Sequence, residues 1–146
     1  MVVAIFGDSC TGKSAIAEKL AQQLSAEVYS GKDYLRLAKS ESMAAALFKK
    51  KLCAAGTIVY VISEPEQFAL LPDDCVRVLV TASLETIRAR FAQRMHGALP
   101  APVAAMLERK YGQFEQQPHA LRIDTDKTCA EEAAKQIISL LEQKGV

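Results

Sequence analysis

Short apolar runs alternate along the chain with stretches in which apolar residues recur every third or fourth position. Residues 2–6 form an unbroken apolar run, which is typical of a strand buried on both faces of a sheet. In residues 13–24, Ile16, Leu20 and Leu24 lie four positions apart and predict a helix. Similar apolar runs predict further strands at 27–29, 57–62, 76–80 and 120–124.

Helical spacing fills the intervals between these runs. The predicted helices cover 33–54 with a break near 40–42, then 65–70, 84–95, 102–116 and 129–143. Strands that alternate with helices are typical of a parallel sheet covered on both faces, so we expect an α/β fold of three layers, α/β/α. Ligands of such sheets bind beyond the carboxyl ends of the strands. One cleft is therefore expected among the loops 7–14, 30–36, 63–66 and 124–128.

The length and composition of the chain limit the number of domains and the kinds of partner that we expect. The chain has 146 residues, which predicts a single domain, 1–146. Its net charge of +1 disfavours a broad nucleic-acid-binding face. We find no apolar stretch of membrane-spanning length and no signal segment, so we expect a cytoplasmic protein with no membrane partner. No two cysteines form a C-x-x-C pair, which favours four free thiols: Cys10, Cys53, Cys75 and Cys129.

Residues 7–14 read Gly-Asp-Ser-Cys-Thr-Gly-Lys-Ser, a complete G-x-x-x-x-G-K-[ST] phosphate-binding loop between a predicted strand and a predicted helix. Gly7 and Gly12 let the backbone approach an anion, so that successive N–H groups converge on a phosphate. Lys13 is expected to neutralise charge on the β- and γ-phosphates, and the Ser14 hydroxyl to ligate Mg²⁺. The loop therefore predicts ATP and Mg²⁺ as ligands.

Nine residues in and beside this loop are expected to contact the nucleotide: Gly7, Asp8, Ser9, Cys10, Thr11, Gly12, Lys13, Ser14 and Ala15. Because Cys10 lies inside the loop, its oxidation or alkylation is expected to block nucleotide binding.

The order of these elements resembles the small P-loop kinases of the nucleoside monophosphate kinase and shikimate kinase group. The resemblance implies a five-stranded parallel sheet of order 2-3-1-4-5, an acceptor-side helical segment at about 31–55 and a short lid at about 95–110. The segment 90–96 is similar to the one that enters the lid of adenylate kinases. By that resemblance, Arg90 covers the adenine and Arg94, one helical turn later, contacts phosphate.

The closing segment 123–127 is similar to the end of this family, where the loop after the fifth strand borders the adenine. We place Asp126 among the nucleotide-binding residues on this basis, although its position also suits a loop or capping role. Arg94 has a physical rationale of its own, because the planar guanidinium suits a phosphoryl group whose charge is spread over three oxygens.

The acceptor side carries fewer signals. Asp33 falls where shikimate kinases carry an acidic segment used for acceptor and metal, so it is a candidate base or a holder of Mg²⁺-bound water. Its alternative role is the N-cap of the helix that follows. Arg36 is a candidate residue for binding an anionic acceptor. Glu64, at the end of the third strand, is a candidate for orienting Mg²⁺-bound water, or a cap of the next short helix.

These features favour ATP-dependent phosphoryl transfer to a small-molecule hydroxyl or phosphate, with Lys13, Asp33 and Arg94 as the catalytic set. Residues 30–56 leave room for only a short acceptor region, so the acceptor is expected to be small. A nucleotide-binding module without efficient transfer is the alternative, because a second acid near Asp33 is missing and the lid is poor in arginine. A nucleic-acid 5′-end kinase is disfavoured by the near-neutral charge.

Overall fold

A computed structural model describes residues 1–145 and contains one five-stranded, all-parallel sheet with the order β2-β3-β1-β4-β5. The predicted strand order is confirmed. The five strands are β1 (Val2–Phe6), β2 (Glu27–Ser30), β3 (Ile58–Ile62), β4 (Val76–Thr81) and β5 (Leu121–Asp124).

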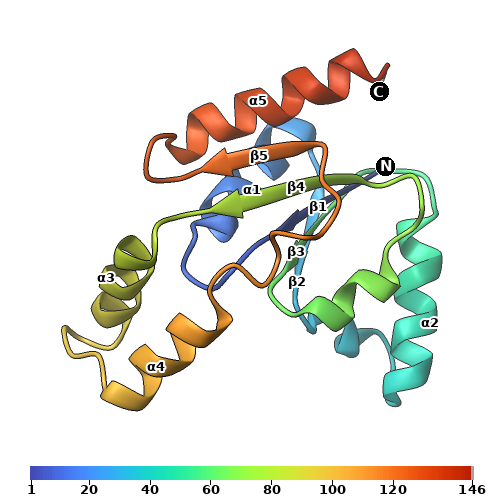
Figure 1. Cartoon of the computed structure of the whole chain (residues 1–146). Helices are drawn as coiled ribbons and strands as arrows, with labels where there is room; N and C mark the ends of the chain where they lie inside the picture. Colours follow the sequence, from blue (N-terminus) through green and yellow to red (C-terminus); the bar gives the residue numbers. More distant parts are fainter. Residues whose placement is uncertain (146) are drawn as a thin grey trace.

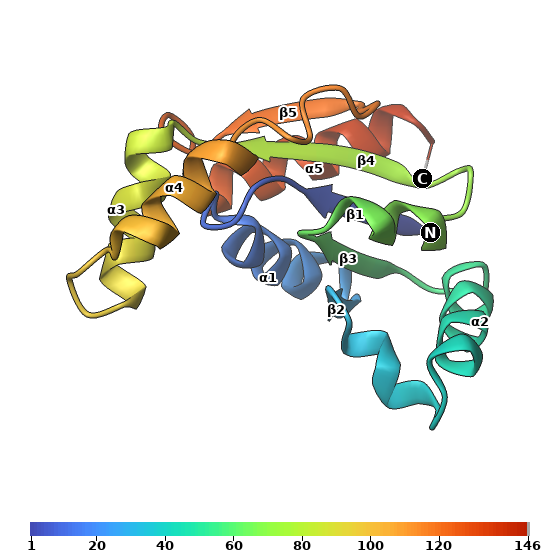
Figure 2. The same cartoon turned by 60° about the horizontal axis from the view of Figure 1, so that its bottom comes forward.

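Helices cover both faces of the sheet, as predicted (Figure 1). They are α1 (Lys13–Leu24), the 3₁₀ helix η1 (Asp33–Leu37), α2 (Glu41–Leu52), the 3₁₀ helix η2 (Pro65–Leu70), α3 (Leu84–Arg94), α4 (Ala101–Lys110) and α5 (Ala130–Gln143). Helices α1 and α5 pack together on one face, whereas α2 and both 3₁₀ helices lie on the other. Figure 2 shows α3 and α4 as a pair beyond the carboxyl end of β4. No helix among the described residues is long and apolar enough to cross a membrane.

Strand β1 explains why the phosphate-binding loop has a fixed position. It lies at the centre of the sheet, paired with β3 and β4, and all five of its residues are buried. Val3 and Ile5 enter the core beneath α1 and α5, whereas Ala4 and Phe6 enter the core on the opposite face. Because successive side chains of a strand point to opposite faces, an unbroken apolar run is what this position requires.

The second core is aromatic and holds η1 and α2 on the sheet. The Phe48 ring of α2 lies with its centroid 4.9 Å from that of Tyr29, 5.3 Å from Tyr34 and 5.0 Å from Tyr60. The Tyr60 hydroxyl donates a hydrogen bond to the Gly31 carbonyl oxygen at 2.7 Å, and burial raises the pKa of Tyr60. The turn after β2 is therefore anchored to β3 and, through Phe48, to α2.

Two helix boundaries differ from the sequence prediction. The helix predicted over 102–116 was wrong at its end, because α4 stops at Lys110 and turns follow. Tyr111 leaves helical geometry and Gly112 adopts a left-handed φ of +80°. The segment predicted at 33–54 divides into η1 and α2. The break between them lies slightly before the predicted one, at Ala38, whose backbone is extended. Ser40 then caps α2 by accepting a hydrogen bond from the Met43 N–H at 3.2 Å.

Candidate active site

The phosphate-binding loop leaves β1 and enters α1 directly, in the order that the sequence predicts. Gly7 is required by close packing, because a Cβ there would lie 2.1 Å from the Val80 carbonyl oxygen of β4. Gly12 is required by conformation, because residues with a Cβ rarely adopt its backbone φ of +96°. The loop is thus held against β4 at one glycine and turned into α1 at the other. All four cysteines are free thiols, and within the loop Cys10 is buried.

Lys13 lies beneath the loop and is only 6% exposed. Its ammonium nitrogen donates hydrogen bonds to the carbonyl oxygens of Gly7 at 2.8 Å and Asp8 at 2.6 Å. Burial lowers the pKa of Lys13 to about 8, and the nearby Arg94 acts in the same direction, while Asp8 and Cys10 partly oppose both. A buried cation held only by neutral carbonyl oxygens favours an anion beside it.

A hollow of about 370 Å³ lies on the loop, and we call it the phosphate hollow. Its walls bring Lys13 and Ser14 together with Arg94 from the end of α3. Ser30 and Ser63, which no sequence pattern indicated, complete it from the ends of β2 and β3. The only signal that could have identified these two serines as site residues is their position at the carboxyl edge of the sheet. Their residue type gives no signal, because serine is common in ordinary turns.

A second hollow of about 290 Å³ lies beside α1, and we call it the base-side hollow. Arg90 forms one wall, and its Nη1 donates to the Cys10 carbonyl oxygen at 3.0 Å and to the Thr125 hydroxyl oxygen at 3.1 Å. The Thr125 hydroxyl in turn lies 2.7 Å from the Thr11 carbonyl oxygen, to which it donates. Arg90 and the loop after β5 therefore face the same space. The contact of both with an adenine stays a prediction.

The acceptor-side acids hold local structure. The exposed Asp33 accepts a hydrogen bond from the Ser30 N–H through Oδ2 at 3.0 Å, and the Arg36 Nε donates to the Asp33 carbonyl oxygen at 3.1 Å. The exposed Glu64 is the N-cap of η2 and pairs with Gln67 through its backbone: its N–H donates to the Gln67 Oε1 at 3.4 Å, and its carbonyl oxygen accepts from the Gln67 N–H at 3.1 Å. None of Asp33, Arg36 and Glu64 lines the phosphate hollow.

Asp126 connects the loop after β5 to the start of α3. Its Oδ2 accepts a hydrogen bond from the Ser83 N–H at 2.9 Å, and hydrogen bonds from the Thr86 hydroxyl and from Ser83 lower the pKa of Asp126. Asp126 is not among the residues that line the base-side hollow. Its contact with a nucleotide stays a prediction, whereas its capping role is visible.

The phosphate hollow offers a protein oxygen suited to Mg²⁺, the Ser14 hydroxyl. Within residues 1–145, no group of three or more His, Cys, Asp or Glu side chains is placed to hold a metal ion. The exposed Ser14 borders the phosphate hollow, where an oxygen ligand is required. A single hydroxyl ligand fits a magnesium ion that takes most of its other ligands from phosphate oxygens and water, which is how Mg²⁺ is commonly bound.

A phosphate-binding loop after the central strand of a parallel 2-3-1-4-5 sheet defines the fold of the small P-loop kinases of the shikimate kinase-like group. No protein-family model matches the chain, and no curated protein matches it in sequence. Solved structures match over nearly the whole chain.

One of these structures is the YorR protein of Bacillus subtilis in complex with phosphorylated GDP, with a TM-score of 0.72 and 20% identity over 99% of this chain and 98% of that one. Another is the shikimate kinase of Acinetobacter baumannii in complex with shikimate, with a TM-score of 0.68 and 12% identity over 98% and 93%. A gluconokinase of Sinorhizobium meliloti matches with a TM-score of 0.65 and 13% identity over 99% and 97%.

Proposed function

We propose that the protein is an ATP-dependent phosphotransferase that moves the γ-phosphoryl group of ATP to a small-molecule acceptor. The observation that carries the proposal is the phosphate hollow, which the buried Lys13, Ser14 and Arg94 of α3 line together. An arginine opposite the loop suits a phosphoryl group in transit, because three equatorial oxygens then share its charge. Kinases of small molecules among the solved structures with this fold support the same reaction class.

Each part of the site has a role in this proposal. The backbone N–H groups of residues 9–14 and the Lys13 ammonium hold the phosphates, and Arg94 contacts the group that is transferred. Arg90 and the loop 124–128 enclose the adenine in the base-side hollow. Mg²⁺, when bound, neutralises charge on the β- and γ-phosphates. Ser14 would ligate it, and Asp33 and Glu64 are the carboxylates proposed to act on it through water.

Asp33 is also the base in this proposal, accepting the proton of the acceptor hydroxyl. Arg36, one turn later on η1, would contact an acceptor that carries negative charge. Both residues follow β2 at the carboxyl edge of the sheet, the edge at which the phosphate-binding loop follows β1. The aromatic core around Phe48 supports this position, because it fixes η1 against α2 and the sheet.

A nucleotide-binding module without efficient transfer is the second candidate, and one observation favours it. The Asp33 carboxylate already accepts the Ser30 N–H and so serves as a local cap. In such a module the phosphate and base-side hollows would bind ATP as proposed, and no acceptor would be phosphorylated.

The experiment that separates the two candidates is an incubation of the protein with Mg-ATP and a panel of small metabolites, with ADP release as the readout. We expect one group of acceptors to raise ADP release above the acceptor-free rate. Lys13→Ala removes the buried cation and should abolish both nucleotide binding and turnover. Lys19→Ala, on an exposed position of the same helix, is the matched control and should leave both unchanged.

Tight ATP binding without acceptor-dependent ADP would support the module instead. Unchanged affinity and activity in the Lys13→Ala variant would overturn the assignment of the site itself.

A further inference from the structure

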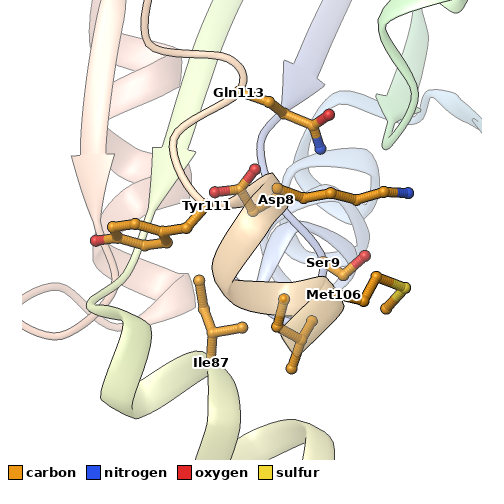
Figure 3. Close-up of a pocket in the computed structure, with 8 residues that line it drawn as sticks. Asp8, Ser9, Ile87, Met106, Tyr111 and Gln113 are labelled. Carbon is orange, nitrogen blue, oxygen red and sulfur yellow. The ribbon is translucent and has the colours of Figure 1, made fainter. Parts of the chain in front are cut away.

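A third and smaller hollow adjoins the phosphate hollow on the side of α3 and α4 (Figure 3), and we call it the Asp8 pocket. Ser9 belongs to the walls of both hollows. The Asp8 pocket is bounded by the second and third residues of the phosphate-binding loop, by apolar side chains of α3 and α4, and by the turn after α4. Its lining residues are Asp8, Ser9, Ile87, Met106, Leu107, Lys110, Tyr111 and Gln113.

The Asp8 carboxylate has one oxygen in use and one without a partner. Its Oδ2 accepts a hydrogen bond from the Gly112 N–H at 2.8 Å, which ties the loop to the turn after α4. Its Oδ1 is buried and has no hydrogen-bond partner. The Tyr111 hydroxyl, the nearest phenol in the wall, is itself committed to the Ala82 carbonyl oxygen at 3.1 Å. A buried acceptor atom without a donor is costly, so this position lacks a donor group.

Size and polarity restrict which donor fits. The cavity volume is about 40 Å³, more than the roughly 10–15 Å³ that one water needs. Figure 3 shows the Asp8 carboxylate between Tyr111 and Gln113, with Ile87 and Met106 across the space. Apolar walls suit the carbon of a hydroxymethyl group, and the free oxygen suits its hydroxyl proton. Lys110 also lines the pocket, but it is an exposed residue, whereas the unpartnered oxygen of Asp8 is buried. A phosphate or carboxylate would bring a like charge against this oxygen and is disfavoured.

We propose that the Asp8 pocket binds a hydroxyl-bearing end of an uncharged, polyol-like acceptor, with Asp8 Oδ1 accepting the hydrogen bond. This inference rests on the proposed phosphotransferase function and names its substrate class. The shared wall at Ser9 puts this end of the acceptor directly beside the phosphate hollow. Asp8 is a substrate-binding residue here, in addition to its backbone role in the loop.

The test uses Asp8→Asn with the full-length protein. Asparagine keeps an oxygen for the Gly112 N–H but presents an NH₂ group where Oδ1 stood, so it no longer accepts the acceptor hydroxyl. The acceptors are glycerol, erythritol, ribose and glucose, set against the anions glycerol 3-phosphate and gluconate. ADP release with Mg-ATP measures turnover, and saturation-transfer NMR with Mg-ADP present measures polyol binding directly. Asp73→Asn, at an exposed aspartate before β4, is the matched control.

We expect a neutral polyol to serve as acceptor. Asp8→Asn should raise its KM by about ten- to a hundredfold, the loss expected for a hydrogen bond to a charged group, with the Tm close to wild type. Asp73→Asn should change none of these values. Met106→Phe fills the pocket from α4 and leaves Asp8 in place, so it should raise the same KM. This variant replaces Asp8→Asn as the test if Asp8→Asn lowers the Tm.

The outcomes distinguish this inference from the proposed function. Turnover of anionic acceptors alone, or a polyol KM that both variants leave unchanged, overturns the Asp8 pocket assignment, because a water then suffices there, while the phosphotransferase stands. Absence of ADP release with every acceptor overturns the phosphotransferase. In that case a polyol NMR signal lost in Asp8→Asn still supports the pocket, and no such signal overturns it.

Discussion

The Lys13 ammonium nitrogen lies 2.8 Å from the Gly7 carbonyl oxygen, so the cation of the phosphate-binding loop is held by the backbone of that same loop. The Asp8 carbonyl oxygen, at 2.6 Å, is its second acceptor. Both partners are neutral, and the side chain is almost fully buried. A polyphosphate would replace these weak partners with negative charge, which predicts a coupling between nucleotide affinity and pH.

Nucleotide affinity should fall as the pH rises above about 8. The pKa of Lys13 is lowered to about 8, so Lys13 loses its proton above that pH in the free protein. A bound phosphate favours the charged form and raises this pKa, so binding takes up a proton in that range. The Kd for ATP should therefore increase by up to about tenfold per pH unit above pH 8 and be insensitive to this group below it. Titrations with a fluorescent ATP analogue at several pH values measure the slope.

Lys13→Arg provides the control for this slope. Arginine keeps its charge across the whole range, so its Kd should show no dependence on pH above 8, whatever its absolute value. The same slope in both proteins would place the titrating group elsewhere.

Arg90→Ala should weaken ATP binding severalfold and leave tripolyphosphate binding nearly unchanged. Arg90 forms a wall of the base-side hollow, and stacking of a guanidinium on an aromatic base is worth on the order of 1 kcal/mol. Tripolyphosphate has the charge of the nucleotide but no base, so calorimetric titration with each ligand isolates the base contact. Arg88→Ala is the control, because Arg88 pairs with Glu108 and does not line the hollow.

Equal losses for ATP and tripolyphosphate would contradict the stacking role. They would show that Arg90 acts on the loop itself through its hydrogen bond to the Cys10 carbonyl oxygen.

Asp33→Asn should reduce turnover by about 100-fold or more if Asp33 is the base. Asparagine keeps an oxygen that can accept the Ser30 N–H, so ATP affinity and Tm should stay close to wild type. Acceptor-dependent ADP release, divided by the folded fraction from circular dichroism, measures the effect. A lower Tm with normal turnover per folded molecule would leave Asp33 as a cap only, and Glu64→Gln would then be the next variant to measure.

Phe48→Ala should lower the free energy of unfolding by about 3–5 kcal/mol, because it empties the centre of the aromatic core. Leu47→Ala, at the neighbouring and 43% exposed position, should change it by no more than about 0.5 kcal/mol. Urea denaturation of both variants measures the difference. Similar small effects in the two would show that the acceptor side is not held by this cluster.

Local patterns were sufficient to predict the strands and the strand–loop–helix order around residues 7–14, whereas the order of strands in the sheet came from the resemblance to small P-loop kinases. The apolar run of β1 and the glycines of the loop each depend on a few neighbouring positions, so the sequence carries them directly. Arg94 was selected by the resemblance to adenylate kinases, and its position one turn after Arg90 agrees with that resemblance. The end of α4 was missed because its cause is distant. Gly112 and Tyr111 are held by Asp8 and Ala82, and no short-range pattern reveals such pairs.

Only part of the candidate site could be predicted from the sequence, because only part of it lies in one short segment. Residues 7–14 form one continuous segment, whereas Ser30, Ser63 and Thr125 come from three separate strand ends. Serine and threonine are ordinary turn residues, so their types give no signal before the sheet is assembled. Asp8 was expected as part of the loop, but its unpartnered oxygen depends on how α4 and the following turn pack against it.

The hydrogen bond between Thr125 and the Thr11 carbonyl oxygen spans 114 positions of the chain. During synthesis, the phosphate-binding loop emerges well before Thr125, which follows Thr11 by 114 positions. Until Thr125 emerges, Arg90 lacks its hydroxyl partner, and β4 lacks the strand that carries the closing loop. The growing chain would therefore hold its phosphate-binding loop without the side chain that secures it until this later segment has been made. Tight nucleotide binding should begin only when the last strand has joined the sheet.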